Sequence, residues 1–409
     1  MPGTLALVTL VSRGDVEAAR TALAGVIRTT PVFHSRPLTE RAGGPVAFKC
    51  ENLQRTGSFK IRGAYVRISR LAPAERAAGV VAASAGNHAQ GVAYAASLLD
   101  TAATVFMPEG APLPKVEATR GYGAQVRFAG ATVDEALAAA TAYAEEQGAV
   151  FVHPFDHPDI VAGQGTAGLE LLEQWPEVRT ILVPTGGGGL VSGIAAAVKP
   201  ARPDVRIVAV QAAGAAAFPA SLAAGRPLPL DAMATIADGI AVGEPGSVTF
   251  AHVAALVDDV VTVSEEALSR ALLLCLERAK LLVEPAGAAG VGAVMEEPQA
   301  YEPPVAVVLS GGNIDPILLL RLLRHGMIAA GRYLSFRLRI PDRPGELARL
   351  LGMLAASGAN VLDVEHRRTG AKLHIDEVEV ALQLETRGAE HCHEVLTRLR
   401  RAGYPLHLD

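Results

Sequence analysis

The chain has 409 residues, which is more than one typical domain needs and enough for a large hydrophobic core. Half of its residues are hydrophobic, yet no apolar run approaches the ~20 residues that cross a bilayer, and the apolar patch at residues 5–11 lacks the features of a signal peptide. The net charge is −5 and no basic stripe appears, so nucleic acid is not an expected partner, and without a membrane-spanning run neither is a membrane. The three cysteines lie far apart, which favours a reducing, cytoplasmic setting without disulfides.

The first part of the chain leads to a lysine in an unusual position. A helix is predicted over residues 15–27, a turn at Thr29-Thr30-Pro31 and a strand at Val46 to Lys49. The chain then turns at Thr56-Gly57-Ser58 and opens a helical pattern with Lys60 in its first turn. Unpaired N–H groups at a helix start lower the pKa of an ammonium group, and a neutral amine is what a Schiff base needs. A lone lysine is nevertheless far more often a solvated surface residue.

A second stretch is rich in small residues and reads Ser84-Ala85-Gly86-Asn87-His88-Ala89-Gln90-Gly91. It follows a short apolar strand and leads into a helical run from Gln90 to Leu99. Small residues let backbone N–H groups turn toward a ligand, and a helix N-terminus attracts an anion. The stretch therefore predicts a binding site for a carboxylate.

From residue 46 to about residue 260, short apolar strands alternate with alanine-rich helical runs. This alternation predicts an α/β fold in which helices flank a parallel sheet, and the continuous Val/Ile/Leu strands fit burial on both faces. The predicted strands lie at 80–83, 104–107, 125–128, 180–183 and 207–211, and the predicted helices at 115–121, 132–147, 162–174 and 190–198.

Four consecutive glycines, Gly186 to Gly189, follow the strand at 180–183 and precede the helical run from Leu190. We do not expect packing to be the reason for such a run. A glycine run on its own is compatible with a flexible loop. Between a buried strand and a helix, it favours a nest of N–H groups that wraps a phosphate.

Two further segments carry candidate site residues. A strand at 258–263 is followed by a helix that starts with Ser264 and runs to about Lys280. Glu284 follows it, either as a functional carboxylate or as an ordinary helix-start residue. A valine-rich strand then leads into Leu309-Ser310-Gly311-Gly312-Asn313.

The pattern changes after Gly326. Alternation at 333–340 predicts a half-buried strand, and the turn Pro341 to Leu347 leads into a helix. Strands at 360–367 and 374–385, a helix at 389–401 and a short strand at 404–408 complete a βαββαβ order. A domain boundary is therefore expected at about 328–333.

Three motifs occur in an order that resembles the fold type II pyridoxal-phosphate enzymes, and within them the threonine and serine dehydratases. They are Gly-Ser-Phe-Lys-x-Arg-Gly-Ala, Ser-x-Gly-Asn-His and the tetraglycine loop, and the resemblance covers roughly residues 15 to 325. It implies a two-lobed catalytic domain at 1–328, with a smaller lobe at about 53–150 and pyridoxal 5'-phosphate between the lobes.

The resemblance also implies the roles of single residues. Lys60 would bind the cofactor as a Schiff base and act as the catalytic base, Asn87 would contact the 3-oxygen of the ring, and Ser310 would face the pyridine nitrogen. The implied cofactor-binding residues are Phe59, Lys60, Asn87, Gly186, Gly187, Gly188, Gly189, Leu190 and Ser310. The implied substrate-binding residues are Ser84, Ala85, Gly86, Asn87, His88 and Glu284.

Residues 333–409 resemble an ACT domain, a module that usually senses small molecules such as amino acids. Asp342, Gly345 and Asn360 are the expected effector residues, with isoleucine or valine as leading effectors. Exposed sheet edges predict pairing with another copy, in a homodimer or homotetramer. A ferredoxin-like oligomerisation module without a ligand remains the alternative.

The function that the resemblance implies is removal of water and ammonia from L-threonine to give 2-oxobutanoate, with serine as a slower substrate. The alternatives are a dehydratase for L-serine or 3-hydroxyaspartate, a serine racemase, and a catalytically weak amino acid sensor. Serine racemases of this family carry a serine immediately before the glycine of the second motif, whereas this chain has Ala85. Residues 210–217, which correspond to the divalent-metal segment of some relatives, contain no carboxylate, so no divalent metal is expected.

Overall fold

The structure, a computed structural model, describes residues 8–368 and 374–408. The chain divides into two compact units, Met1–Pro316 and Ile317–Asp409. This division lies before the boundary expected from the sequence, because helix α14 (Pro316–Ala329) falls almost entirely within the second unit.

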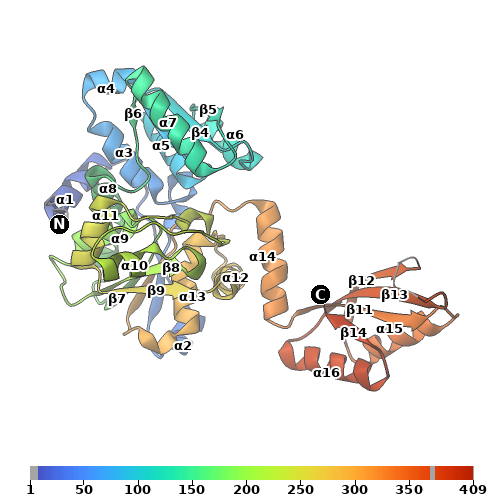
Figure 1. Cartoon of the computed structure of the whole chain (residues 1–409). Coiled ribbons are helices and arrows are strands. Elements are labelled where there is room, and N and C mark those ends of the chain that lie inside the picture. Colours follow the sequence, from blue (N-terminus) through green and yellow to red (C-terminus); the bar gives the residue numbers. More distant parts are fainter. Residues whose placement is uncertain (1–7, 369–373, 409) are drawn as a thin grey trace. The chain divides into compact units, whose positions relative to one another are not determined.

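The larger lobe of the first unit is built on a six-stranded sheet (Figure 1). Strand β1 is antiparallel to β2, and all other neighbouring strands are parallel. In order across the sheet the strands are β1 (Val32–His34), β2 (Val46–Lys49), β10 (Val305–Val308), β7 (Thr180–Pro184), β8 (Arg206–Ala212) and β9 (Asp259–Val263). Every residue of β2, β10 and β7 is buried, as expected for strands covered on both faces.

Helices cover both faces of this sheet (Figure 1). Side chains of α8, α9 and α11 pack with Ile181, Ile207 and Val308 in one core cluster. On the opposite face α13 approaches so closely that a Cβ on Gly290 would lie 2.7 Å from Val307. The helices of this lobe are α1 (Arg13–Ala22), α2 (Arg36–Ala42), α8 (Pro158–Gln174), α9 (Gly189–Val198), α10 (Ala217–Ala224), α11 (Ser247–Leu256), α12 (Glu265–Leu274) and α13 (Ala289–Glu296).

The smaller lobe contains a parallel four-stranded sheet. Its strands, in order, are β5 (Gln125–Phe128), β4 (Ala103–Met107), β3 (Val80–Ala83) and β6 (Val150–Phe151). Its helices are α3 (Lys60–Ser69), α4 (Pro73–Ala78), α5 (Asn87–Leu98), α6 (Leu113–Gly121) and α7 (Val133–Gln147). Alternate residues of β3 separate two cores, with Val80 packed among residues of α3 and α5 and Val81 packed against α7. The predicted α/β class with parallel sheets is confirmed.

The predicted and observed elements differ at several places, and α2, α4, α10 and α11 were not predicted. Helix α1 ends at Ala22 rather than near residue 27, and the very short strands β1 and β6 were not predicted. The helix expected to reach Lys280 ends at Leu274 and continues as one π turn, Cys275–Ala279. Lys280 then adopts a left-handed conformation with φ 59° and ends the π turn.

The second unit contains α14 and the predicted βαββαβ module. The module consists of β11 (Tyr333–Pro341), α15 (Glu346–Ala356), β12 (Asn360–Arg367), β13 (Glu377–Glu385), α16 (Ala389–Arg401) and β14 (Leu406–Leu408). Its antiparallel sheet has the order β12-β13-β11-β14. Alternate residues of β11, such as Phe336 and Leu338, pack with Leu350 of α15 and Val395 of α16.

Candidate active site

Lys60 is the first residue of α3 and follows a tight turn. Thr56 and Gly57 both have positive φ, at 63° and 72°. A Cβ on Gly57 would collide with the side-chain oxygen of Asn313, so only glycine fits the turn. The Lys60 side chain is half-buried, and its Nζ donates a hydrogen bond to the carbonyl oxygen of Pro154 at 2.8 Å.

Burial lowers the pKa of the Lys60 ammonium group to about 8, and the nearby charge of Glu284 opposes part of this shift. A substantial fraction of the amine is therefore neutral at mildly alkaline pH, which suits both Schiff-base formation and proton abstraction. The sequence predicted a lowered pKa from the field of the helix start. The largest cause is instead removal of the ammonium group from water.

Asn87 joins the two lobes at the site. Its side-chain N–H donates to Glu284 Oε1 at 2.6 Å, and its Oδ1 accepts from Asn313 Nδ2 at 2.8 Å. Gly311 lies against the same group, since a Cβ there would lie 2.9 Å from Asn87 Nδ2. Burial and the charge of Asp238 raise the pKa of the Glu284 carboxyl to about 7, against the opposing effects of Asn87, Lys115 and Lys60. Glu284 is thus a buried carboxyl in the site, and its location favours the functional interpretation.

The loop between β3 and α5 supplies fewer free backbone donors than predicted. Ser84 N–H donates to Phe106 O at 3.1 Å, and Gly86 N–H donates to Ser84 Oγ at 3.1 Å. Helix α5 begins at Asn87, and the N–H groups of its first turn have no hydrogen-bond acceptor within the helix. The His88 ring contacts Val152 O at 2.8 Å, and burial lowers its pKa to about 3, so its imidazole stays neutral. The backbone N–H groups of the first turn of α5, rather than the His88 ring, are the groups that remain for a carboxylate.

The tetraglycine loop lies directly before α9, whose N-cap is Gly188 with φ 94°. Contrary to the expectation from the sequence, packing does require these glycines. A Cβ on Gly186 would lie 2.9 Å from Ile240 Cα, one on Gly187 would overlap the Phe155 ring, and one on Gly188 would lie 2.8 Å from Phe218. The close packing of these side chains leaves the loop backbone and the first turn of α9 as the groups able to hold a phosphate.

Short segments connect the glycine loop, Ser310 and Lys60. Pro154 accepts the hydrogen bond from Lys60, and the next residue, Phe155, packs on Gly187 and Gly189. Ser310 is buried, and its carbonyl oxygen accepts from Phe59 N–H at 3.2 Å. Lys60, Asn87, Glu284, Ser310 and the glycine loop are therefore brought together in the first unit.

A buried charge network supports the start of α3. Arg62, two residues after Lys60, donates to both oxygens of Glu51 at 2.8 Å and to Glu170 Oε1 at 2.7 Å. Lys49 donates to the other oxygen of Glu170 at 2.6 Å. Arg62, Lys49 and Glu51 are fully buried, and the two cations balance the two carboxylates. The network ties α3 to β2 and α8.

Sequence analysis missed three groups at this site. Asn313 bridges Asn87 and the carbonyl oxygen of Thr56, Pro154 O holds the lysine amine, and Asp238 acts on the Glu284 carboxyl. The position of Asn313 in the Ser-Gly-Gly-Asn segment was the one available signal. Pro154 and Asp238 lie in irregular segments that carry no recognisable motif.

The expected effector residues do not all lie together. Asp342 and Gly345 line a hollow of about 270 Å³ at the turn between β11 and α15, where Asp342 pairs with Arg368 at 3.1 Å. The strand register pairs Asn360 with Glu385, beside Tyr333 at the other end of β11. The eight steps from Tyr333 to Pro341 span roughly 25 Å at ~3.3 Å per residue. Within one chain, Asp342 and Asn360 therefore lie at opposite ends of β11, and a ligand that contacts both would need a second copy of the module. The assignment of Asp342, Gly345 and Asn360 to an effector site stays a prediction.

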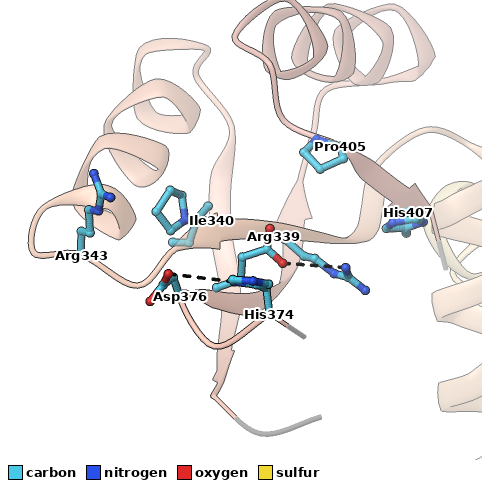
Figure 2. A pocket seen from close by; sticks show the side chains of 9 residues that line it. Arg339, Ile340, Arg343, His374, Asp376, Pro405 and His407 are labelled. Atoms are coloured by element: carbon cyan, nitrogen blue, oxygen red, sulfur yellow. Dashed lines mark ion pairs between the residues drawn. The ribbon is translucent and has the colours of Figure 1, made fainter. Parts of the chain in front are cut away.

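A larger hollow of about 630 Å³ adjoins the same turn (Figure 2). Figure 2 shows Arg339 of β11 and Arg343 of the turn together with His374, Asp376 and His407. His374 lies 4.0 Å from Asp376, and Arg339 lies 3.9 Å from Glu377. The hollow is thus lined by groups of both charges.

In the described part of the chain, no three His, Cys, Asp or Glu side chains are grouped as a metal site would require. Buried Gln211 stands at the end of β8, where its Oε1 accepts from Phe218 N–H at 3.0 Å. An amide at this position offers no anionic ligand to a divalent ion. Among the helices that the structure describes, none is long and apolar enough to cross a membrane.

Comparisons with known proteins agree with this geometry. The L-threonine ammonia-lyase of Thermotoga maritima is 45% identical over 399 residues, which cover 98% of this chain and 100% of that protein. The crystal structure of a threonine deaminase from T.th. aligns with a TM-score of 0.71 at 43% identity and covers 74% of this chain and 99% of that chain. The structure of maize serine racemase aligns with a TM-score of 0.73 at 37% identity, and the alignment covers 76% of this chain and 97% of that chain.

The sequence also matches two protein families. Residues 335–401 match the ACT domain family, which agrees with the βαββαβ module of the second unit. Residues 23–311 match the family described as pyridoxal-phosphate dependent enzyme, and this range contains Lys60, Asn87, Glu284, Ser310 and the whole tetraglycine loop. The chain therefore belongs to the pyridoxal-phosphate dependent enzymes and carries a C-terminal ACT domain.

Proposed function

We propose that the protein is an ammonia-lyase that converts L-threonine to 2-oxobutanoate and ammonia, with L-serine as a secondary substrate. One observation carries this proposal. The Lys60 amine, with its pKa lowered to about 8, stands beside Asn87 and Glu284 in a chain that is 45% identical along nearly its whole length to a protein named L-threonine ammonia-lyase.

The site suits pyridoxal 5'-phosphate in three respects. It offers an amine of lowered pKa at Lys60, a glycine loop at the start of α9 and a buried hydroxyl at Ser310. Lys60 would hold the carbonyl carbon, Gly186 to Leu190 the phosphate, Asn87 the ring 3-oxygen and Ser310 the ring nitrogen. When bound, this cofactor supplies an electron sink for the negative charge that develops on the α-carbon of the substrate.

The residues of the chain select which bond breaks. The N–H groups at the start of α5 hold the substrate carboxylate, and the Lys60 amine removes the proton from the α-carbon that it faces. Because Ser310 is a neutral hydroxyl, it does not keep the ring nitrogen charged as a carboxylate would. This favours elimination over transamination.

Loss of the β-hydroxyl group with the α-proton removes water from threonine. The enamine that leaves the site tautomerises to an imine, which takes up water and releases ammonia. The net reaction converts one threonine into one 2-oxobutanoate and one ammonia.

Racemisation is the second candidate, because the maize serine racemase structure is similar to this chain. A racemase needs an acid on the substrate face opposite Lys60. The side chain of Ala85 carries no proton that it could donate, which disfavours racemisation.

The ACT domain, residues 335–401, supports regulation by a small molecule, for which an amino acid is the proposed class. We further propose a cytoplasmic homodimer or homotetramer. All three cysteines are free thiols, which suits a reducing compartment. Sheet edges of the ACT domain at β12 and β14 offer unpaired backbone groups for a second copy.

A substrate comparison tests the proposed function. Release of 2-oxo acid would be measured from L-threonine, L-serine and 3-hydroxyaspartate at equal enzyme and cofactor concentrations. The proposal expects the highest kcat/KM for threonine. A higher value for serine or 3-hydroxyaspartate, or no release from any of the three, would contradict it.

A further inference from the structure

Lys115 and Asp238 form an ion pair between the two lobes of the first unit. Lys115 lies in the first turn of α6 in the smaller lobe, and Asp238 opens the 3₁₀ turn Asp238–Ile240 in the larger lobe. Lys115 Nζ lies 2.8 Å from Asp238 Oδ2. The lysine side chain is only 14% exposed, whereas the aspartate is 58% exposed. Lys115 is thus fixed by its packing, and it forms an ion pair with an Asp238 side chain that is largely exposed to solvent.

The turn that carries Asp238 forms part of the wall of the candidate active site. A Cβ on Gly239 would lie 2.9 Å from the Ala286 side chain and 3.5 Å from Glu284 Oε1. Ile240 Cα lies 2.9 Å from the place of a Cβ on Gly186, the first glycine of the tetraglycine loop. Displacement of the turn would therefore open the space between Glu284 and the glycine loop.

Within its own lobe the turn is held by packing of buried Ala237 and Ile240 and by few hydrogen bonds to regular elements. It lies in the segment 225–246, which contains no α-helix or β-strand. Near the turn, Ala234 N–H donates to Gly214 O at 3.0 Å and Ile236 N–H donates to Glu265 at 2.8 Å. The hydrogen bond from Lys115 adds a tie between Asp238 and the smaller lobe.

The charges of the pair also reach the active site. The carboxylate of Asp238 raises the pKa of the Glu284 carboxyl, and the ammonium group of Lys115 lowers it. Lys60 and the Asn87 amide are the other groups that act on this carboxyl, and both lower its pKa. The ion pair therefore lies close enough to Glu284 for its charges to influence a substrate in the site.

We propose that Lys115 and Asp238 are positioning residues, which hold the 238–240 turn across the mouth of the active site and thereby set the affinity for the amino acid substrate. This inference rests on the proposed function. Neither residue is assigned a chemical step, so the pair acts on substrate retention rather than on the breaking of bonds.

Kinetics of three variants test the pair. Lys115→Met and Asp238→Asn are each expected to raise KM for threonine about two- to fivefold while kcat stays unchanged, as for loss of a partly exposed ion pair. The double variant is expected to match the more affected single variant, because both substitutions break the same contact. Effects that add in the double variant would overturn the proposal.

Another lysine–aspartate pair provides a matched control. Lys199 lies 2.6 Å from Asp258, and its side chain has the same 14% exposure as that of Lys115. This pair joins the end of α9 to the chain just before β9, within the larger lobe. Lys199→Met is expected to leave KM and kcat unchanged. An equal KM rise in this variant would show that loss of any such pair has the effect.

Hydrogen exchange supplies a readout that does not depend on activity. In the substrate-free holoenzyme, peptides covering residues 225–246 are expected to exchange faster in Lys115→Met and Asp238→Asn than in the wild type or Lys199→Met. Unchanged exchange would overturn the proposal. If the wild type does not act on threonine, the proposed function fails, while the exchange comparison still decides whether the pair holds the turn.

Discussion

Asn87 donates a hydrogen bond to Glu284 at 2.6 Å, although the two residues are 197 positions apart in the chain. Asn87 begins α5 of the smaller lobe, and Glu284 follows the π turn after α12 of the larger lobe. The contact therefore fixes one lobe against the other at the site. It also holds a buried carboxyl whose pKa is raised to about 7 beside the catalytic lysine.

The first prediction concerns the pH dependence of stability. Because the pKa of Glu284 rises from 4.5 to about 7 on folding, the folded chain binds this proton more tightly than the unfolded chain. The resulting stabilisation is complete below about pH 4.5 and is lost as pH rises through about 7. At 1.36 kcal/mol for each pKa unit, it amounts to on the order of 3 kcal/mol.

Denaturant unfolding of the wild type and of Glu284→Gln would measure this effect. Relative to the variant, the wild type is expected to lose most of that free energy of unfolding between about pH 5 and about pH 8. Glu145→Gln, which alters an exposed carboxylate of α7, is the control and should show the wild-type pH dependence. A constant difference between wild type and Glu284→Gln across this range would refute the prediction.

The second prediction concerns Lys60. Lys60→Ala is expected to abolish 2-oxo acid release and the absorbance of the lysine-bound cofactor, because no other amine occupies the start of α3. Lys280→Ala changes an exposed lysine and should retain both signals. Absorbance spectroscopy and the 2-oxo acid assay on the same samples would check the result. Normal turnover in Lys60→Ala would remove this lysine from its proposed role.

The site residues within the motifs could be predicted from the sequence, because each motif is a short continuous stretch of the chain. Lys60, Asn87, the four glycines and Ser310 each stand next to a strand end or helix start that the apolar pattern reveals. The residues that contact them in the folded chain could not be predicted in the same way. Pro154 and Asp238 are brought to the site by the packing of distant segments, and their own sequence surroundings have no period or motif. Asn313 stands in the Ser-Gly-Gly-Asn segment, but its contacts with Asn87 and Thr56 depend on the folded chain.

One interpretation failed for a physical reason. The lowered pKa of Lys60 was attributed to the helix start, but burial is its main cause, and burial depends on walls contributed by remote segments. The sequence also did not reveal that Asp342 and Asn360, which flank α15, lie at opposite ends of β11 within one chain.

The third prediction concerns the face of the substrate opposite Lys60. Ala85→Ser would introduce a hydroxyl at the position where serine racemases of the family carry serine. Dehydration is expected to be largely retained, and slow interconversion of L- and D-serine is expected to appear. Chiral separation of serine after incubation would measure it. Efficient racemisation by the wild type would refute the premise that Ala85 withholds an acid.

The fourth prediction concerns the buried charges behind α3. Arg62→Met would leave Glu51 and Glu170 without their shared guanidinium partner, and loss of one member of such a network costs ~3–5 kcal/mol. A matching decrease in the free energy of unfolding is expected in denaturant titrations. Arg36→Met removes a surface pair with Glu40 and should leave the midpoint unchanged. Equal effects of the two substitutions would contradict the prediction.

The last prediction concerns the ACT domain. A chain that ends at Gly331 retains every residue of the candidate active site and loses the whole βαββαβ module, which begins at Tyr333. It is expected to bind the cofactor and to deaminate threonine. The complete chain is expected to change its KM or kcat when isoleucine or valine is added, whereas the shortened chain should not respond.

The strand register explains why this response should need more than one copy of the module. Asp342 and Asn360 of one chain are kept apart by the length of β11, so a ligand that contacts both requires a second copy. Coupling of this kind typically changes affinity by 1–3 kcal/mol, which corresponds to roughly 5- to 150-fold. Asn360→Ala tests one half of such a site without removing the module. An intact enzyme that ignores every amino acid, or a shortened chain that keeps the full response, would show that the ACT domain does not regulate the active site.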